Sequence, residues 1–111
     1  MVKNSEELNI IITNYGKQLE TLFDGVEIRL FGSYLNNCAK PYSDIDLAVI
    51  SPDFNGIDYI TALKLLNRLK NNICVDIEAI PIAYDDFIAP KLGSIAYEVS
   101  KNSKLVYKAT F

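Results

Sequence analysis

The segment Ser43–Ile50 constrains the fold most, because it combines a strongly apolar strand pattern with two carboxylates on one face. Its large aliphatic side chains alternate with Asp44 and Asp46, and a period of two is that of a β-strand. Neighbours on one strand face lie about 6.6 Å apart along the backbone, and aspartate is depleted in strands. The segment therefore predicts either a central strand whose carboxylates share a cation or an edge strand whose charges face water.

The rest of the chain predicts two long helices and two further strands around this segment. Apolar residues recur at helical spacing in Ser5–Leu22 and Ile57–Lys70, and they alternate with other residues in Val26–Phe31 and Ile73–Ile80. The expected elements are a helix over Ser5–Leu22, strands over Val26–Phe31 and Ile73–Ile80, and a helix over Ile57–Lys70. Alternating helices and strands predict an α/β (α+β) fold in which helices cover a mixed β-sheet.

The tail after Pro81 has a weaker pattern. Short helices are expected over Tyr84–Ala89 and Ile95–Lys101, and a closing strand over Leu105–Lys108. The length of 111 residues, without repeats or a linker-like stretch, predicts one domain over residues 1–111.

The composition excludes several kinds of chemistry. The chain has no histidine and two cysteines, which excludes Ser-His-Asp and Cys-His nucleophile pairs, histidine-ligated zinc and a four-cysteine metal cage. Eleven basic residues against fourteen acidic ones give a net charge of −3, which disfavours a protein that coats nucleic acid. Any chemistry must therefore use carboxylates, hydroxyls, lysine and arginine.

The sequence predicts a cytoplasmic protein. Charged residues interrupt the N-terminal region, and the longest apolar run, Leu47–Ile50, is far shorter than the roughly 20 residues of a transmembrane helix. Cys38 and Cys74 are expected to be reduced thiols.

Gly32-Ser33 follows the first predicted strand directly. A turn at this place has free backbone N–H groups, and glycine lets a phosphate approach the backbone closely. The pair is either a phosphate-binding turn or an ordinary turn.

A third carboxylate comes from the third predicted strand. If this strand lies beside Ser43–Ile50, Asp76 joins Asp44 and Asp46, and three carboxylates can hold two metal ions roughly 3.5–4 Å apart. Glu78 shares the same strand face and is the alternative third acid, although Asp76 is preferred.

Leu30-Phe31-Gly32-Ser33 and Ser43-Asp44-Ile45-Asp46-Leu47 form the spacing G-S-x10-D-x-D. This pattern resembles the signature of the DNA polymerase β-like nucleotidyltransferase superfamily, and more narrowly the minimal nucleotidyltransferase (MNT) group. The resemblance covers the chain from the first helix to the third strand and implies the nucleotidyltransferase fold. It implies that Gly32 and Ser33 bind the nucleoside triphosphate. It also implies that Asp44, Asp46 and Asp76 hold two Mg²⁺ ions, with Asp76 helping to deprotonate the acceptor hydroxyl.

The same resemblance implies a function and a partner. Many members of the group pair with a small helical HEPN protein, which implies an antitoxin that transfers AMP from ATP to a tyrosine hydroxyl of that toxin. A homo- or hetero-oligomer is therefore expected. The alternatives are nucleotidyl transfer to a small molecule of the aminoglycoside type, and a non-catalytic module that binds a nucleotide or a partner.

The chain departs from these relatives in one respect. Many of them carry an arginine shortly after Gly-Ser, where this chain has Leu35 and Asn36, and Lys40 is the nearest cation in the loop. Arg29, on the strand before the turn, either reaches a nucleotide or pairs with Glu27 or with solvent.

Overall fold

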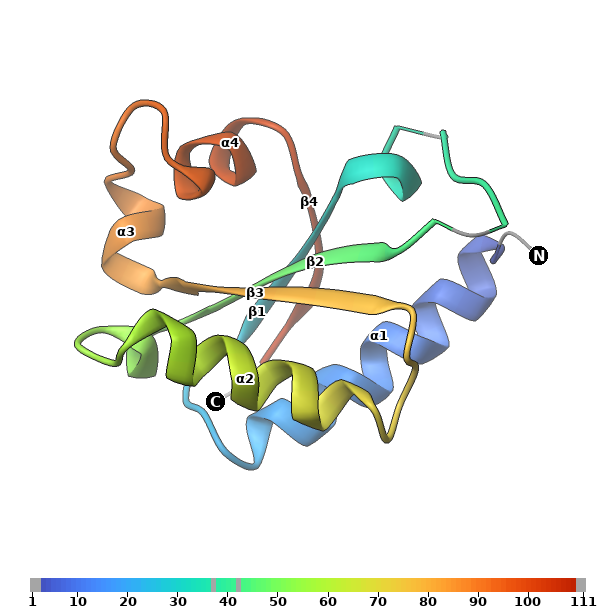
Figure 1. The fold of residues 1–111 in the computed structure, drawn as a ribbon, viewed down its shortest axis with the longest axis horizontal. Helices are drawn as coiled ribbons and strands as arrows, with labels where there is room; N and C mark the ends of the chain where they lie inside the picture. Colours follow the sequence, from blue (N-terminus) through green and yellow to red (C-terminus); the bar gives the residue numbers. More distant parts are fainter. Residues whose placement is uncertain (1–2, 37, 42, 110–111) are drawn as a thin grey trace.

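Four strands form one mixed sheet in the order β3-β2-β1-β4 (Figure 1). The computed structural model describes residues 3–36, 38–41 and 43–109. Strand β1 runs antiparallel to β2 and β4, whereas β2 and β3 are parallel. The strands are β1 (Glu27–Phe31), β2 (Ile45–Ser51), β3 (Ile77–Ala83) and β4 (Lys104–Lys108). The sheet confirms the predicted α+β fold, and it makes β2 a central strand.

In the part of the chain that the structure describes, four α-helices accompany the sheet, with two short 3₁₀ turns between elements. They are α1 (Ser5–Glu20), α2 (Tyr59–Lys70), α3 (Tyr84–Ile88) and α4 (Ile95–Lys101), and the 3₁₀ turns are η1 (Gly32–Tyr34) and η2 (Pro52–Phe54). Helix α1 starts at the capping box formed by Asn4 and Glu7. Among the residues that the structure describes, no helix has the length and apolar character needed to cross a membrane.

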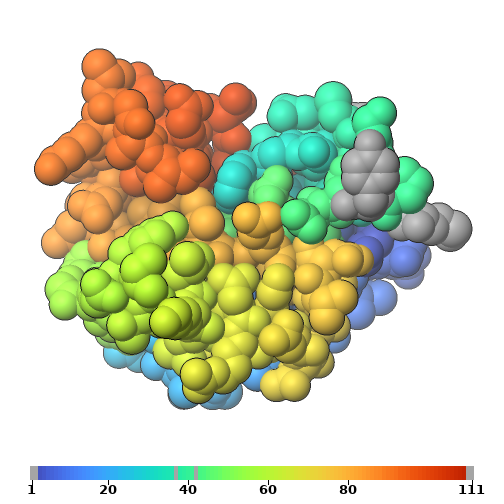
Figure 2. Space-filling model, viewed as in Figure 1, coloured from blue at the N-terminus to red at the C-terminus, as the bar shows by residue number. Residues whose placement is uncertain are grey.

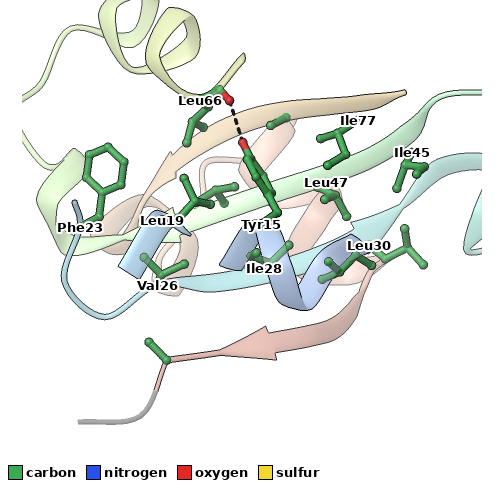
Figure 3. Packing of buried hydrophobic residues seen from close by; sticks show 14 of the residues in the cluster. Tyr15, Leu19, Phe23, Val26, Ile28, Leu30, Ile45, Leu47, Leu66 and Ile77 are labelled. Atoms are coloured by element: carbon green, nitrogen blue, oxygen red, sulfur yellow. Dashed lines mark hydrogen bonds between the residues drawn. The ribbon is translucent and has the colours of Figure 1, made fainter. Parts of the chain in front are cut away.

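Helices α1 and α2 pack on one face of the sheet and bury the main core (Figure 3). Tyr15 from α1 is fully buried there, and its hydroxyl donates a hydrogen bond of 2.9 Å to the backbone oxygen of Leu66 in α2. Burial raises the pKa of the Tyr15 hydroxyl well above its usual range. This bond ties the two helices together beneath the sheet.

The opposite face of the sheet is divided into an apolar half and an acidic half. Ala48 and Ile50 of β2 and Ile82 of β3 form a second core with Ala96 and Val99 of α4. Asp46 lies on this same face of β2, since side chains two residues apart point the same way. The short helices therefore cover one half of the face and leave the half at Asp46 for the site.

The third strand starts at Ile77, so its predicted start at Ile73 is wrong. Helix α2 continues to Lys70, and turns held by bonds from the N–H groups of Ile73 and Cys74 to the Lys70 carbonyl follow it. Val75, predicted on the apolar face, is 69% exposed. Residues 73–76 have the alternating pattern of a strand, but they form the turn that reverses the chain after α2.

Candidate active site

Gly32 and Asp46 lie in direct contact where β1 ends. Phe31, the last residue of β1, pairs with Asp46 across the sheet, so the chain leaves β1 directly over the Asp46 carboxylate. Gly32 has a φ of +73°, and a Cβ atom added there would lie 2.2 Å from Oδ2 of Asp46. The backbone conformation and the lack of space both require glycine.

The Gly32-Ser33 turn is held by its own hydrogen bonds. The Gly32 carbonyl accepts bonds from the N–H groups of Leu35 and Asn36, and also from the Asn36 side-chain amide at 3.2 Å. The Ser33 carbonyl accepts a bond from the Cys38 N–H. These bonds fix the conformation of the turn next to the start of β2.

Glu78 joins Asp44 and Asp46 from the neighbouring strand. The parallel register pairs Glu78 with Asp46. A hydrogen-bond contact with the Asp44 carboxyl, then burial, then the charges of Asp44 and Asp46 raise the pKa of Glu78. Burial and the charge of Asp44 raise the pKa of Asp46 in the same way. Three carboxyl groups therefore crowd one end of the sheet face.

Asp76 is placed differently. It precedes β3, and its carbonyl accepts a bond of 2.8 Å from the N–H of Ile45. Its carboxylate forms a salt bridge of 2.6 Å with Nζ of Lys3, and the hydrogen bond from Lys3 lowers the pKa of Asp76. The structure thus brings Glu78, the alternative third acid of the sequence analysis, close to Asp44 and Asp46. It pairs Asp76, the preferred third acid, with Lys3, which the sequence pattern did not single out.

The carboxylate cluster of Asp44, Asp46 and Glu78 has the donor atoms that a hard divalent cation prefers. All three side chains supply oxygen, the ligand type that Mg²⁺ prefers. In the described ranges, no three acidic or thiol side chains stand as close together as the ligands of one ion. The carboxylates would therefore have to close around a cation.

Two hollows adjoin the carboxylate cluster. One, of about 540 Å³, lies between α2 and β3 and is lined by Asp44, Glu78, Asn67 and Lys70 among others. The other, of about 120 Å³, lies between the Gly32 turn and α4. Figure 2 shows the surface hollowed between the orange α3–α4 region and the cyan-green segment that follows β1.

The family model that describes the nucleotidyltransferase domain matches residues 12–104 of this chain. The chain belongs to this family. The match spans both the Gly32 turn and the carboxylate cluster, and it confirms the resemblance carried by G-S-x10-D-x-D. It also supports nucleotidyl transfer as the general activity.

Solved structures share the fold of the domain. One is a protein of Sulfolobus solfataricus assigned as a nucleotidyltransferase, with 16% identity, 97% of this chain and 92% of that chain covered, and a TM-score of 0.64. Another is a toxin–antitoxin structure with AMP-PNP, with 22% identity, coverage of 91% and 73%, and a TM-score of 0.59. No curated protein matches the sequence.

Proposed function

We propose that the domain is a Mg²⁺-dependent nucleotidyltransferase that moves AMP from ATP to a hydroxyl group of a partner protein. The observation that carries the proposal is the contact between Gly32 and Asp46, with Glu78 beside Asp46. A turn suited to phosphate and a cluster suited to a divalent cation thereby lie at one place on the sheet.

The turn and the carboxylates have separate roles in this proposal. Gly32 and Ser33 bind the triphosphate through backbone N–H groups, because glycine leaves the backbone open to a phosphate. Asp44, Asp46 and Glu78 would hold Mg²⁺, with Asp76 as the alternative third ligand. Bound Mg²⁺ would neutralise charge on the phosphates and on the departing pyrophosphate.

The acceptor hydroxyl attacks the α-phosphorus, a new P–O bond forms, and the bond to the β-phosphate breaks. The Glu78 carboxylate accepts the hydroxyl proton, the general-base role that a carboxylate beside the incoming acceptor can take. Glu78 also lines the larger hollow, from which an acceptor can approach on the side of the cluster away from Gly32. This arrangement suits an in-line displacement, in which positioning and charge stabilisation dominate.

The partner is proposed to be a small helical HEPN-type toxin, which would make the domain its antitoxin. The similar fold of a toxin–antitoxin structure that contains AMP-PNP supports both the adenine nucleotide and the protein partner. A small-molecule acceptor and a non-catalytic module are the alternatives that the experiment below separates.

The test incubates the domain with Mg²⁺, ATP and the protein encoded by the adjacent reading frame, and measures intact masses. The partner should gain one AMP, and D44N and D46N should abolish the gain. D86N, at an exposed aspartate of α3, removes the same charge outside the site and should leave transfer intact.

The third carboxylate is identified by comparing E78Q with D76N in the same assay. Transfer lost in E78Q and retained in D76N supports Glu78; the reverse result supports Asp76. No adduct, together with no thermal shift by Mg²⁺-ATP, would reject the enzyme and leave the binding module.

A further inference from the structure

Arg29 lies on the site face of the sheet, close to the Gly32 turn. In β1, Ile28 and Leu30 point into the main core, so Arg29 and Phe31 point to the face that carries Asp46. Arg29 pairs with Ala48 across the sheet, and Phe31 pairs with Asp46. The backbone of Arg29 therefore lies two residues along β1 from Phe31, the residue that pairs with Asp46.

The surroundings of Arg29 do not neutralise its charge. Its guanidinium carbon lies 5.1 Å from the centre of the Phe87 ring, and Nη1 donates a long hydrogen bond of 3.4 Å to Ser103 Oγ. Nε is buried and has no hydrogen-bond partner within the described part of the chain. Buried donors of a charged group are normally bonded, so this nitrogen indicates a missing acceptor.

No carboxylate supplies that acceptor. Glu27, the acid on the same face of β1, pairs with Lys108 at 3.8 Å. Across residues 3–36, 38–41 and 43–109, no acidic side chain forms a salt bridge with Arg29. Of the alternatives that the sequence left open for Arg29, pairing with Glu27 is therefore not found in the structure.

A hollow of about 120 Å³ lies between the Gly32 turn and α4, next to the residues that hold Arg29. Its lining includes Phe31, Gly32 and Asn36 on the strand side, and Val99 and Asn102 on α4. The Ser103 hydroxyl, which accepts from Arg29, donates to the Val99 carbonyl. The guanidinium is thus held, through Ser103, beside the α4 wall of the hollow that Gly32 also lines.

We propose that Arg29 binds the terminal phosphates of the nucleotide in the hollow between the Gly32 turn and α4. The inference rests on the proposed function and extends it to a residue outside the G-S-x10-D-x-D motif. A guanidinium carries a permanent charge and a fork of donors that matches phosphate oxygens. Phosphate oxygens would provide the acceptors that the guanidinium lacks.

The test measures calorimetric affinities for ATP, AMP and inorganic tripolyphosphate, each with Mg²⁺ and with chelator. R29Q should weaken ATP and tripolyphosphate by about tenfold or more, the usual effect of losing a charged hydrogen bond, and should leave AMP unchanged. R29K should bind with intermediate affinity. E98Q should bind tripolyphosphate more tightly than the wild type, because Glu98 also lines the hollow and its carboxylate repels phosphate.

Two control variants separate phosphate binding from packing. R68Q removes the same charge from an exposed position of α2 and should retain wild-type affinities. F87L removes the aromatic contact of Arg29 but keeps its charge, so it should lower the melting temperature without weakening tripolyphosphate. Equal losses for F87L and R29Q would overturn the proposal, as would equal losses for ATP and AMP in R29Q.

The outcome also separates this inference from the proposed function. If the wild type transfers AMP and R29Q binds ATP normally, the inference fails and the proposed function stands. If the wild type transfers nothing but binds tripolyphosphate in chelator through Arg29, the proposed function fails and the inference stands.

Discussion

At the scale of single residues, the site depends on one glycine and on which acid completes a cluster. The motif singled out Gly32 and Asp46, and the structure shows a physical reason for the pair, since the carboxylate occupies the space of a glycine Cβ. The pattern could not decide between Asp76 and Glu78. Alternation gives both residues the same strand face, whereas in the structure Asp76 precedes β3 and pairs with Lys3, which favours Glu78 as the third acid.

G32A should lower both the stability of the fold and its response to nucleotide, because it strains the backbone and also displaces Asp46. The added methyl group would displace the Asp46 carboxylate, and the φ of +73° would strain alanine. We expect a loss of about 1–3 kcal/mol in the free energy of unfolding and no stabilisation by Mg²⁺-ATP in thermal melts. G56A is the matched control, because Gly56 has a φ of +81° but nothing within 4 Å of its Cβ position. Equal nucleotide responses in G32A and G56A would contradict the role of the Asp46 contact.

E78Q should stabilise the metal-free domain at neutral pH. The raised pKa of Glu78 means that the folded state binds this proton more tightly than the unfolded state. The wild type therefore loses stability as pH rises from the ordinary glutamate pKa through the raised one. Urea unfolding in chelator should show E78Q more stable than the wild type at pH 7, with the difference vanishing below the ordinary glutamate pKa. A stability gap that persists in acid would contradict this origin.

At the scale of elements, the long amphipathic segments could be predicted and the connections could not. The presence of α1, α2 and β2 follows from the sequence, which left open whether β2 is central or at an edge. The late start of β3 does not, because the turn after α2 contains Ile73, Cys74 and Val75, which also suit a strand. The contacts between α2 and β3, which the sequence does not reveal, fix where the chain reverses. Lys70 and Asn67 of α2 donate hydrogen bonds to the β3 carbonyls of Ile77 and Ala79.

G16A should destabilise the contact between α1 and β4. An added Cβ would lie 2.6 Å from the ring of Tyr107. Alanine gains up to about 1 kcal/mol over glycine within a helix, whereas overpacking costs about 1–3 kcal/mol, so the clash should win. Chemical unfolding should show a net loss of stability in G16A and a smaller loss when Y107L is also present. A stabilised G16A would show that Tyr107 moves away at little cost.

At the scale of the whole molecule, the two faces of the sheet have separate tasks. The face under α1 and α2 is filled by aliphatic side chains and supplies most of the core. The other face is half closed by α3 and α4, which leaves the acidic half accessible beside the Gly32 turn. The sequence predicted the first face through helical periodicity. The expected short helices over Tyr84–Ala89 and Ile95–Lys101 are confirmed as α3 and α4, but at 5 and 7 residues they are too short for periodicity to show which face of the sheet they cover.

Mg²⁺ should stabilise the whole fold, because its proposed ligands come from segments far apart in the chain. Asp46 lies on β2, Glu78 lies on β3, and unfolding the sheet would separate their carboxylates. A ligand that binds only the folded state at ten times its dissociation constant adds about 1.4 kcal/mol. Thermal melts should therefore shift upward with MgCl₂ in the wild type and in D86N, but not in D46N. NaCl at matched ionic strength separates binding from screening, and an equal shift with both salts would show that the carboxylate cluster responds only to screening.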